Sequence, residues 1–301
     1  MPLLSICIPT YNRADILKKS LESIVSQEEF LDGNEVEVVI SDNCSSDNTP
    51  EVAQDFVKKF GHKIKYFRNK ENIENRNFAL VLSQGNGEFL KICNDTLIYQ
   101  PNSLKYLLHC VREYQKDKKV LFFFNSKKDK NINCQSLDDF VTNVSFMSTW
   151  IGGFGIWKSD IKYLSYMEKY ANTYLSQVAV LMKMLEQKGG SVLCVQKFCE
   201  LAHPSVSGNY NLSKVFIINY GNILNEYVQK NKLSKKVYKK EMWQVLKKHV
   251  LPRQFNVKYN FKYDKSTFWQ DTKIYHKSIK FYYYLLKTFI KKFKYFFKGI
   301  R

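Results

Sequence analysis

Residues 94–96, Asn-Asp-Thr, carry side chains that could bind a metal ion or a ligand hydroxyl. They come just after residues 88–92, a run with strand character, and Asp95 is the one carboxylate among them. The Asp95 carboxylate, the Asn94 carbonyl and the Thr96 hydroxyl are oxygen ligands of the kind that Mg²⁺ and Mn²⁺ accept, although few charged ligands imply weak binding. The other interpretation is a polar turn in which the Asn or Asp side chain hydrogen-bonds nearby backbone.

Two further polar segments, residues 10–13 and 42–47, also follow apolar runs. Asp42 comes directly after residues 36–41, where a carboxylate can accept a hydrogen bond from a nucleobase N–H or a ribose hydroxyl. Alternatively, Asp42 and Asp47 are turn and helix-capping residues, and Tyr11 is a packed aromatic side chain at a strand end.

The elements that position these segments alternate between strands and helices. Near-continuous apolar runs predict strands, and apolar residues at helical spacing predict the helices between them. The expected strands are 3–9, 36–41, 64–67 and 88–92, with helices at 14–27, from about 50, and at 75–84. This order predicts an α/β fold with a mostly parallel sheet and crossover helices on both faces. Ligands of such sheets bind at the carboxyl ends of the strands, where all three polar segments fall.

The same residues resemble a known family. Residues 5–13, SICIPTYNR, resemble the first strand of family 2 glycosyltransferases of the GT-A fold, which typically ends in P-T-Y-N-R. Residues 41–49, SDNCSSDNT, are similar to the second-strand motif V-D-D-G-S-T-D-x-T. Arg76-Asn77 and residues 87–90, GEFL, are similar to the A-R-N and G-E-Y-I motifs that follow. The resemblance covers about residues 3–208 and implies a GT-A, Rossmann-like domain.

The resemblance implies a nucleotide-diphosphate sugar donor, for which a UDP-sugar is one candidate, and transfer with inversion at the anomeric carbon. It places Asn94, Asp95 and Thr96 at the D-x-D position, where a divalent metal, Mg²⁺ or Mn²⁺, would bind. The residues implied to bind the nucleotide are Pro9, Thr10, Tyr11, Arg13, Asp42, Arg76, Asn94 and Asp95. Those implied on the acceptor side are Gly152, Gly153 and Trp157, because glycines allow close approach of a ligand and a Trp can stack on a sugar face.

Two departures from the family pattern concern the chemistry. The D-x-D position holds a single carboxylate, and Ser176-Gln177 stands where an E-D pair would supply the base that inverting transfer needs. Asp95, Glu200 and His203 are the catalytic candidates, with the base unassigned, and Asp160 and Glu168 are further carboxylates to consider. His203 begins H-P-S-V-S, which resembles the H-x-x-S-x-S near the end of this domain, so it could contact the diphosphate or join Asp95 and Thr96 on the metal.

The charge divides the chain into two regions, expected at 1–210 and 211–301. Residues 1–200 contain 25 Lys and Arg against 24 Asp and Glu, whereas residues 201–301 contain 22 against 4. A basic and mostly helical region seeks an anionic partner. Residues 278–301 have the pattern of an amphipathic helix for an anionic membrane surface, and the alternative is a helix packed on the body. The apolar positions of this pattern are Tyr282, Leu285, Leu286, Phe289, Phe293, Phe296, Phe297 and Ile300, and the lysines opposite them are Lys280, Lys287, Lys291, Lys294 and Lys298.

Composition excludes several classes of protein. Hydrophobic residues make up 45% of the 301 residues, which argues against general disorder. The seven scattered cysteines form no CxxC pair, so neither a disulfide framework nor a zinc site is expected. We therefore expect a reducing compartment. We see no leader and no membrane-spanning window. No nucleic acid is expected as a partner because no recognition motif accompanies the basic charge. No G-x-G-x-x-G follows the first strand, which disfavours a dehydrogenase.

The sequence therefore predicts a bacterial inverting glycosyltransferase with a glycan or lipid-linked acceptor. Together with the basic tail, the resemblance implies surface polysaccharide synthesis, such as capsule or lipooligosaccharide, in the cytoplasm at the inner face of the cell membrane. The alternative is a catalytically weakened GT-A-fold module that binds nucleotide or glycan without transfer, which both departures favour.

Overall fold

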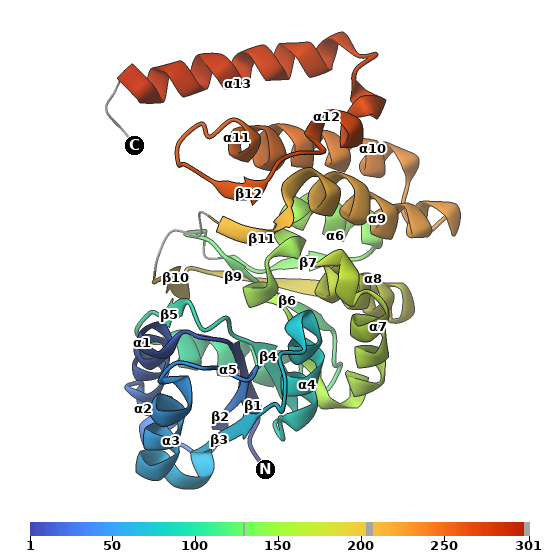
Figure 1. Cartoon of the computed structure of the whole chain (residues 1–301). Helices are drawn as coiled ribbons and strands as arrows, with labels where there is room; N and C mark the ends of the chain where they lie inside the picture. Colours follow the sequence, from blue (N-terminus) through green and yellow to red (C-terminus); the bar gives the residue numbers. More distant parts are fainter. Residues whose placement is uncertain (129, 203–206, 298–301) are drawn as a thin grey trace.

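A computed structural model describes residues 1–128, 130–202 and 207–297. Its central sheet has the strand order β3-β2-β1-β4-β8, and Figure 1 labels β1 to β4. The first four of these strands are parallel, and β8 pairs antiparallel with β4. The strands are β1 (Leu4–Thr10), β2 (Val36–Asp42), β3 (Ile64–Arg68), β4 (Phe89–Ile92) and β8 (Gly155–Trp157).

Alternate residues of the central strands enter two different cores. Ile6 and Ile8 of β1 pack with the helices α1 and α3, whereas Cys7 packs with α4 on the opposite face. Because both faces are covered, the strands are buried along their length and their sequences are nearly continuously apolar. The helices of this half are α1 (Ala14–Val25), α2 (Glu28–Leu31), α3 (Thr49–Phe60), α4 (Asn77–Gln84) and α5 (Ser103–Tyr114).

A second layer extends the molecule beyond the central sheet (Figure 1). It contains a three-stranded sheet of order β6-β9-β7 and a two-stranded pair formed by β5 and β10. The strands are β5 (Leu97–Tyr99), β6 (Val120–Asn125), β7 (Ile132–Cys134), β9 (Ser191–Gln196) and β10 (Cys199–Leu201), and the helices are α6 (Leu137–Val144), α7 (Leu164–Lys169) and α8 (Ser176–Lys188).

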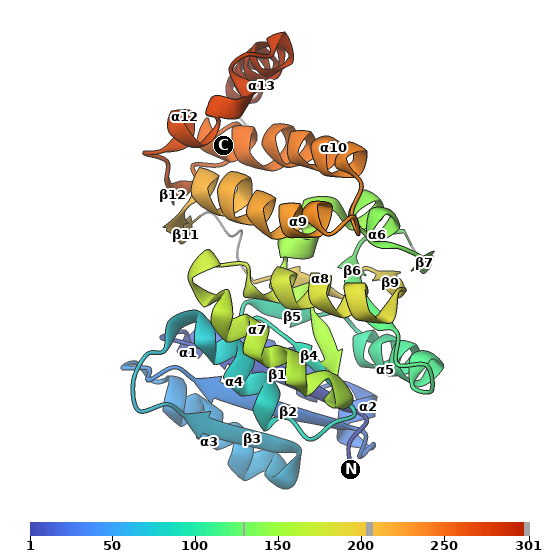
Figure 2. The same cartoon turned by 90° about the vertical axis from the view of Figure 1, so that its right-hand side faces the viewer.

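The C-terminal part is mainly helical and stacks on this layer (Figures 1 and 2). One hydrophobic cluster runs from Cys7 and Leu181 through Tyr220 to Phe281, so the two parts share a continuous core. The elements are β11 (Ser207–Asn211), α9 (Tyr220–Gln229), α10 (Lys235–Val245), α11 (Leu251–Gln254), β12 (Lys262–Asp264), α12 (Phe268–Asp271) and α13 (Ile279–Phe297), with π-helical turns at Lys214–Asn219 and Leu246–Val250.

The mostly parallel α/β sheet expected from the sequence is confirmed. The antiparallel strand β8 was not expected, because its three residues are too few to show a strand period. All seven cysteines are free thiols, and six of them are buried. Among the helices of the described residues, none combines the length and apolarity needed to cross a bilayer.

Candidate active site

A cavity of about 340 Å³ lies where β1 and β4 end, beside the start of α4. Its lining combines the end of β1, the turn after β4 and the polar residues that precede α4. Six of the residues implied to bind a nucleotide line it: Pro9, Thr10, Tyr11, Arg13, Asn94 and Asp95. The other lining residues are Asn43, Glu74, Asn75, Asn77, Phe78 and Ile151.

Asp95 is the centre of this cavity's polar contacts. Its side chain is buried, and Oδ1 accepts a hydrogen bond from Arg13 Nη1 at 2.7 Å while Oδ2 accepts one from Thr10 Oγ1 at 2.9 Å. Burial raises the pKa of Asp95 above its ordinary value, and the charge of Arg13 opposes this shift. Half of the Arg13 side chain is exposed, so its guanidinium is both paired with Asp95 and accessible from solvent.

The backbone at residues 93–97 makes a turn and holds Asp95 in place at the same time. Asn94 O accepts a hydrogen bond from Leu97 N at 2.9 Å, and Cys93 N donates to Cys7 O at 2.8 Å. Thr96 O accepts from Ala202 N at 2.8 Å, which brings the chain after β10 alongside the site. The turn and site interpretations of residues 94–96 are therefore compatible: the backbone forms the turn, and the Asp95 carboxylate faces the cavity residues Thr10 and Arg13.

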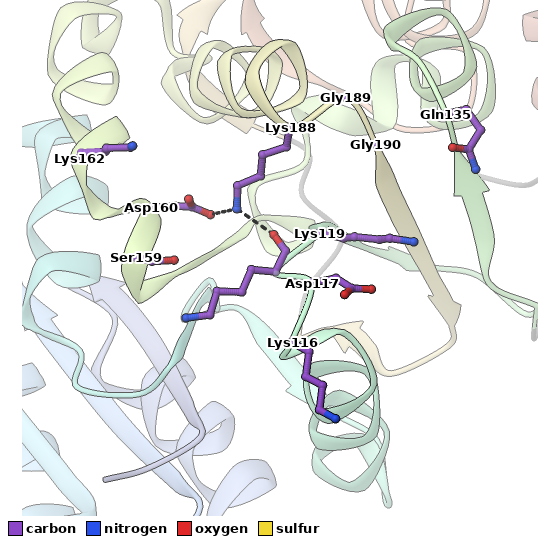
Figure 3. Close-up of a pocket in the computed structure, with 11 residues that line it drawn as sticks. Lys116, Asp117, Lys119, Gln135, Ser159, Asp160, Lys162, Lys188, Gly189 and Gly190 are labelled. Atoms are coloured by element: carbon purple, nitrogen blue, oxygen red, sulfur yellow. Dashed lines mark hydrogen bonds and ion pairs between the residues drawn. The ribbon is translucent and has the colours of Figure 1, made fainter.

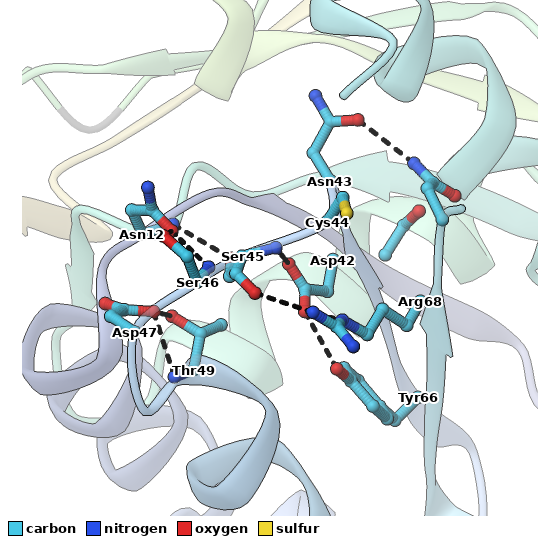
Figure 4. Close-up of polar contacts among 12 residues, drawn as sticks. Asn12, Asp42, Asn43, Cys44, Ser45, Ser46, Asp47, Thr49, Tyr66 and Arg68 are labelled. Atoms are coloured by element: carbon cyan, nitrogen blue, oxygen red, sulfur yellow. Dashed lines mark hydrogen bonds and ion pairs between the residues drawn. The ribbon is translucent and has the colours of Figure 1, made fainter. Parts of the chain in front are cut away.

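The loop after β2 holds the segment that carries Arg13, and Figure 4 shows Ser46, Asp47 and Thr49 close to Asn12. Asp47 accepts hydrogen bonds from Thr49 N at 3.0 Å and from Ala14 N at 3.1 Å, which joins the start of α3 to the start of α1. Thr49 Oγ1 accepts from Arg13 N at 3.1 Å, and Asn12 Oδ1 accepts from Ser46 N at 2.7 Å. Residues 12–14 are therefore fixed by the loop, and the capping interpretation of Asp47 agrees with these contacts.

Asp42 does not lie in the cavity, contrary to the expected contact with a nucleobase. Its side chain is fully buried, and its two oxygens accept from Ser45 N at 2.9 Å and Tyr66 Oη at 2.8 Å (Figure 4). The Arg68 guanidinium lies 3.6 Å from the same carboxylate. Both oxygens of the Asp42 carboxylate therefore accept hydrogen bonds from the following turn and from β3. This agrees with the interpretation of Asp42 as a turn residue.

A group of amide side chains lines the part of the cavity where Asp42 was expected. Asn77 donates to Ser41 O at 2.9 Å and accepts from Ser41 Oγ at 2.6 Å, which ties α4 to the end of β2. Asn43 donates to Asn72 Oδ1 at 2.6 Å and accepts from Asn69 Nδ2 at 3.1 Å. The sequence analysis missed Asn43, Asn75 and Asn77 as lining residues. The Asn-rich composition of residues 69–77 was the signal that could have indicated them.

Arg76 is exposed and lies outside the residues that line the cavity, so its expected contact with the base or ribose stays a prediction. It ends a short 3₁₀ turn, and its neighbours Asn75 and Asn77 face the cavity instead. The backbone around the cavity is strained, because Asn12, Cys44 and Glu74 all have positive φ angles between 51° and 67°. Such conformations cluster at functional sites.

The described residues do not form a divalent metal site. Asp95 has both carboxylate oxygens engaged, one of them by a cation, and Thr96 is absent from the cavity lining. Within the described ranges, no three His, Cys, Asp or Glu side chains are grouped as metal ligands would be. His203, the third expected ligand, lies outside the described residues. The described part of the donor set is therefore one carboxylate that is already paired, and the metal that the D-x-D resemblance implied stays a prediction.

The residues expected on the acceptor side are packing residues. Trp157 is 1% exposed, donates from Nε1 to Lys119 O at 2.7 Å and packs edge-on against Phe89, so it cannot stack on a sugar. A Cβ on Gly152 would lie 2.6 Å from the Trp150 ring, and one on Gly153 would lie 2.6 Å from Phe122. These glycines therefore allow close packing within the protein, and Ile151 beside them is the residue that lines the cavity.

The candidate bases are spread over the molecule. Asp160 is buried and paired with Lys188 at 2.5 Å, in a larger cavity of about 840 Å³ before β6 and β9 (Figure 3). That cavity lies at the amino ends of those strands, and it shares no residue with the lining at Asp95. Glu168 is exposed on α7, and Glu200 is exposed and paired with Lys197.

Gln177 lies near the cavity but offers no base. It is buried and donates from Nε2 to Thr149 O at 2.8 Å, two residues before the lining residue Ile151. Among the described lining residues, Glu74 is the carboxylate other than Asp95, and its residue is exposed. The sequence analysis did not consider Glu74.

Comparison with known proteins agrees with this architecture. Residues 5–147 match the model of Glycosyl transferase family 2. The abequosyltransferase RfbV of Salmonella typhimurium is 41% identical over 88 residues, which are 29% of this chain and 26% of that protein. A GalNAc(5)-diNAcBac-PP-undecaprenol beta-1,3-glucosyltransferase of Campylobacter jejuni is 38% identical over 97 residues, or 32% of this chain and 30% of that protein. The matched segments thus span less than a third of either relative.

Solved structures share the fold at low sequence identity. S. aureus TarS 1-349 in complex with UDP superposes with a TM-score of 0.57 at 18% identity, over 83% of this chain and 72% of that one. The mannosyltransferase PcManGT from Pyrobaculum calidifontis, in complex with GDP-Man and Mn²⁺, has a TM-score of 0.58 at 12% identity, over 98% and 86% of the two chains. These likenesses confirm the GT-A fold, and residues 5–147 carry the family motifs on it. Residues 5–147 of the chain therefore match glycosyl transferase family 2, and the solved structures show the fold.

Proposed function

We propose that this protein is an inverting glycosyltransferase that moves a sugar from a nucleotide-diphosphate donor to a glycan or lipid-linked acceptor of a bacterial surface polysaccharide. The observation that carries the proposal is the Arg13–Asp95–Thr10 contact inside a cavity at the carboxyl ends of β1 and β4. The family match over residues 5–147 supports it. A UDP-sugar is the first donor to test, because the TarS structure holds UDP.

In this reaction an acceptor hydroxyl oxygen attacks the anomeric carbon. The new C–O bond forms as the bond from that carbon to the diphosphate breaks, and the diphosphate leaves with the electron pair. Negative charge develops on the diphosphate, and Arg13, half exposed and held by Asp95, is the cation placed to compensate it. The acceptor proton passes to a base, and Glu74, Glu200 and His203 are the groups to test for that role.

No step is assigned to a metal, because Asp95, the one carboxylate at the D-x-D position, is already paired with Arg13. Comparing turnover with and without Mn²⁺ examines this directly. Mn²⁺ binding followed by electron paramagnetic resonance gives a readout that is independent of turnover.

The second candidate function is a module of the same fold that binds nucleotide or glycan without transfer. The single carboxylate at residues 94–96 and the amide of Gln177 in place of a base favour it. It predicts nucleotide binding with neither donor hydrolysis nor transfer.

Hydrolysis and transfer of a panel of nucleotide sugars test the main proposal, with wild type compared with Asp95→Ala. Loss of Asp95 leaves Arg13 and Thr10 without their partner, so turnover should fall by roughly 10²-fold or more. Asp55→Ala is the matched control, because Asp55 is an exposed carboxylate on α3 whose partner Lys58 is 3.9 Å away. Equal turnover of Asp95→Ala and wild type would refute the site.

We further propose that α13 docks the protein on an anionic membrane surface, at the inner face of the cell membrane. The helix has two apolar faces. The inner face packs on the body through Phe281, Thr288 and Phe289, and the tilted rings of Phe289 and Phe255 have their centres 4.8 Å apart. The outer face exposes Ile279, Tyr282, Tyr283, Leu286, Ile290, Phe293 and Phe297. The expected apolar positions Leu285 and Phe289 therefore belong to the inner face, while Lys298 and Ile300 lie outside the described residues.

The outer face can be tested without removing the helix, which the buried Phe281 makes part of the core. Replacing Leu286, Ile290 and Phe293 together by Gln should reduce binding to phosphatidylglycerol-containing vesicles. Leu31→Gln, a similarly exposed leucine on α2, should not. Unchanged vesicle binding of the triple variant would contradict membrane docking.

A further inference from the structure

A third cavity, of about 360 Å³, lies between α13 and the segment that joins α10 to α11. Its walls come from residues 247–257 and 283–291, and no described lining residue is acidic. Four lysines from two separate elements line this cavity. Lys247 and Lys248 lie on one wall, and Lys287 and Lys291 lie on the other.

The charge of these lysines is not compensated nearby. Among the described residues, no ion pair involves any of the four. Lys248 acts electrostatically on the buried Glu241, whose pKa burial raises to about 7, so Glu241 is a weak counter-ion at neutral pH. Its oxygens also accept hydrogen bonds from Ser145 at 2.7 Å and Tyr220 at 3.2 Å. The cavity therefore keeps a strong positive potential.

The side chains around the lysines give the cavity a defined shape. Lys247 Nζ lies 5.5 Å from the centre of the Tyr284 ring, and Lys287 Nζ lies 5.7 Å from that of Tyr283. Lys287 and Lys291 are four residues apart on α13, so their side chains share one face of the helix. On another side of α13, a tilted contact between Phe289 and Phe255 holds the helix against the end of α11. Clustered ammonium groups suit an anion with several oxygens, and a phosphate offers these.

We propose that this cavity binds the phosphate headgroup of an anionic lipid. The helix that forms one wall also exposes the apolar outer face, so a lipid headgroup can reach the lysines while its chains lie beside Leu286 and Ile290. The inference deepens the membrane docking proposed above, on which it rests, and gives that docking a specific phosphate site.

Binding to vesicles of phosphatidylcholine mixed with phosphatidylglycerol or phosphatidic acid tests the proposal. Lys287→Gln with Lys291→Gln removes one wall, and Lys247→Gln with Lys248→Gln removes the other. Lys292→Gln with Lys294→Gln is the matched control, because both lysines are exposed on the same helix but do not line the cavity. Each wall variant should bind roughly tenfold more weakly than the control, since direct contacts with phosphate are lost in addition to long-range attraction.

If all three double variants lose vesicle binding equally, the binding comes from non-specific electrostatic attraction, and the proposed phosphate site is wrong. Inorganic phosphate distinguishes the source of the ligand. If inorganic phosphate binds the wild type but not the wall variants, while all three variants bind vesicles like the wild type, the ligand is a soluble phosphate and the lipid assignment is wrong. Donor hydrolysis measured without vesicles separates this test from the proposed transfer, because the wall variants should hydrolyse donor like the wild type.

Discussion

Residues 1–200 and residues 201–301 use their charges in opposite ways. The first region has 25 basic and 24 acidic residues, and its polar side chains are largely bonded to one another: Asp95 to Arg13, Asp47 to the starts of two helices, and Asp160 to Lys188. The second region has 22 basic residues against 4 acidic ones. Among the described residues, Lys230 with Glu186 is the one ion pair that involves this region, and its acid comes from the first.

The difference indicates a division of labour. Internal pairing fixes side chains at a defined geometry, which a site for chemistry requires. Unpaired lysines keep their attraction for an external anionic surface. The shared core from Cys7 to Phe281 nevertheless joins the two regions into one packed structure.

The largest expected effect concerns the internal pairing of the first region. Arg13→Gln removes the cation from Asp95, so turnover of a nucleotide sugar should fall by roughly 10²-fold. Arg112→Gln is the matched control, because Arg112 is also half exposed and paired with a carboxylate, Glu35. Steady-state kinetics of the two variants measures this difference. Equal turnover of Arg13→Gln and Arg112→Gln would show that internal pairing in the first region is not required for the reaction.

A pH dependence comes from the second region. Burial raises the folded-state pKa of Glu241 from 4.5 to about 7, so its contribution to stability is full below about pH 4.5 and is lost as the pH rises to about 7. At 1.36 kcal/mol per unit, the loss is at most about 3 kcal/mol. Urea unfolding at several pH values should show this decline in the wild type and a smaller one in Glu241→Gln. Glu71→Gln, an exposed site in the first region, should keep the decline. Identical slopes in all three proteins would refute the assignment.

The smallest effect tests whether the regions unfold together. Ser136 caps α6 by accepting from Asp139 N, and Ser234 caps α10 by accepting from Val237 N. Replacing either serine by Ala should cost about 1 kcal/mol. Because the two helices belong to one continuous core, both variants should shift the same cooperative urea transition. Two transitions, each shifted by one variant, would show that the regions are independent.

The sequence predicted the sheet and the position of the site because strand periods and strand-end polarity are local properties. It placed Pro9, Thr10, Tyr11, Arg13, Asn94 and Asp95 at one edge, and these residues line the cavity. The sequence did not predict which side chains at that edge of the sheet form hydrogen bonds with one another. Asp42 and Asp95 both follow strands, but Tyr66 and Ser45 occupy Asp42, whereas Arg13 and Thr10 face Asp95.

Packing was the second limit. Gly152, Gly153 and Trp157 match a family region, yet they pack against Leu97, Phe122 and Phe89, which come from other elements and make them core residues. The basic cavity could not be predicted from the sequence either. Its two walls are about 40 residues apart and meet only because α13 packs against α11.

The division of labour is tested most directly by measuring donor hydrolysis and vesicle binding in parallel on two variants. Asp95→Ala should lose nucleotide-sugar hydrolysis and bind phosphatidylglycerol-containing vesicles like the wild type. Lys287→Gln with Lys291→Gln should lose vesicle binding and keep hydrolysis. A variant that loses both activities while remaining folded, or an Asp95→Ala protein that keeps hydrolysis, would contradict the account.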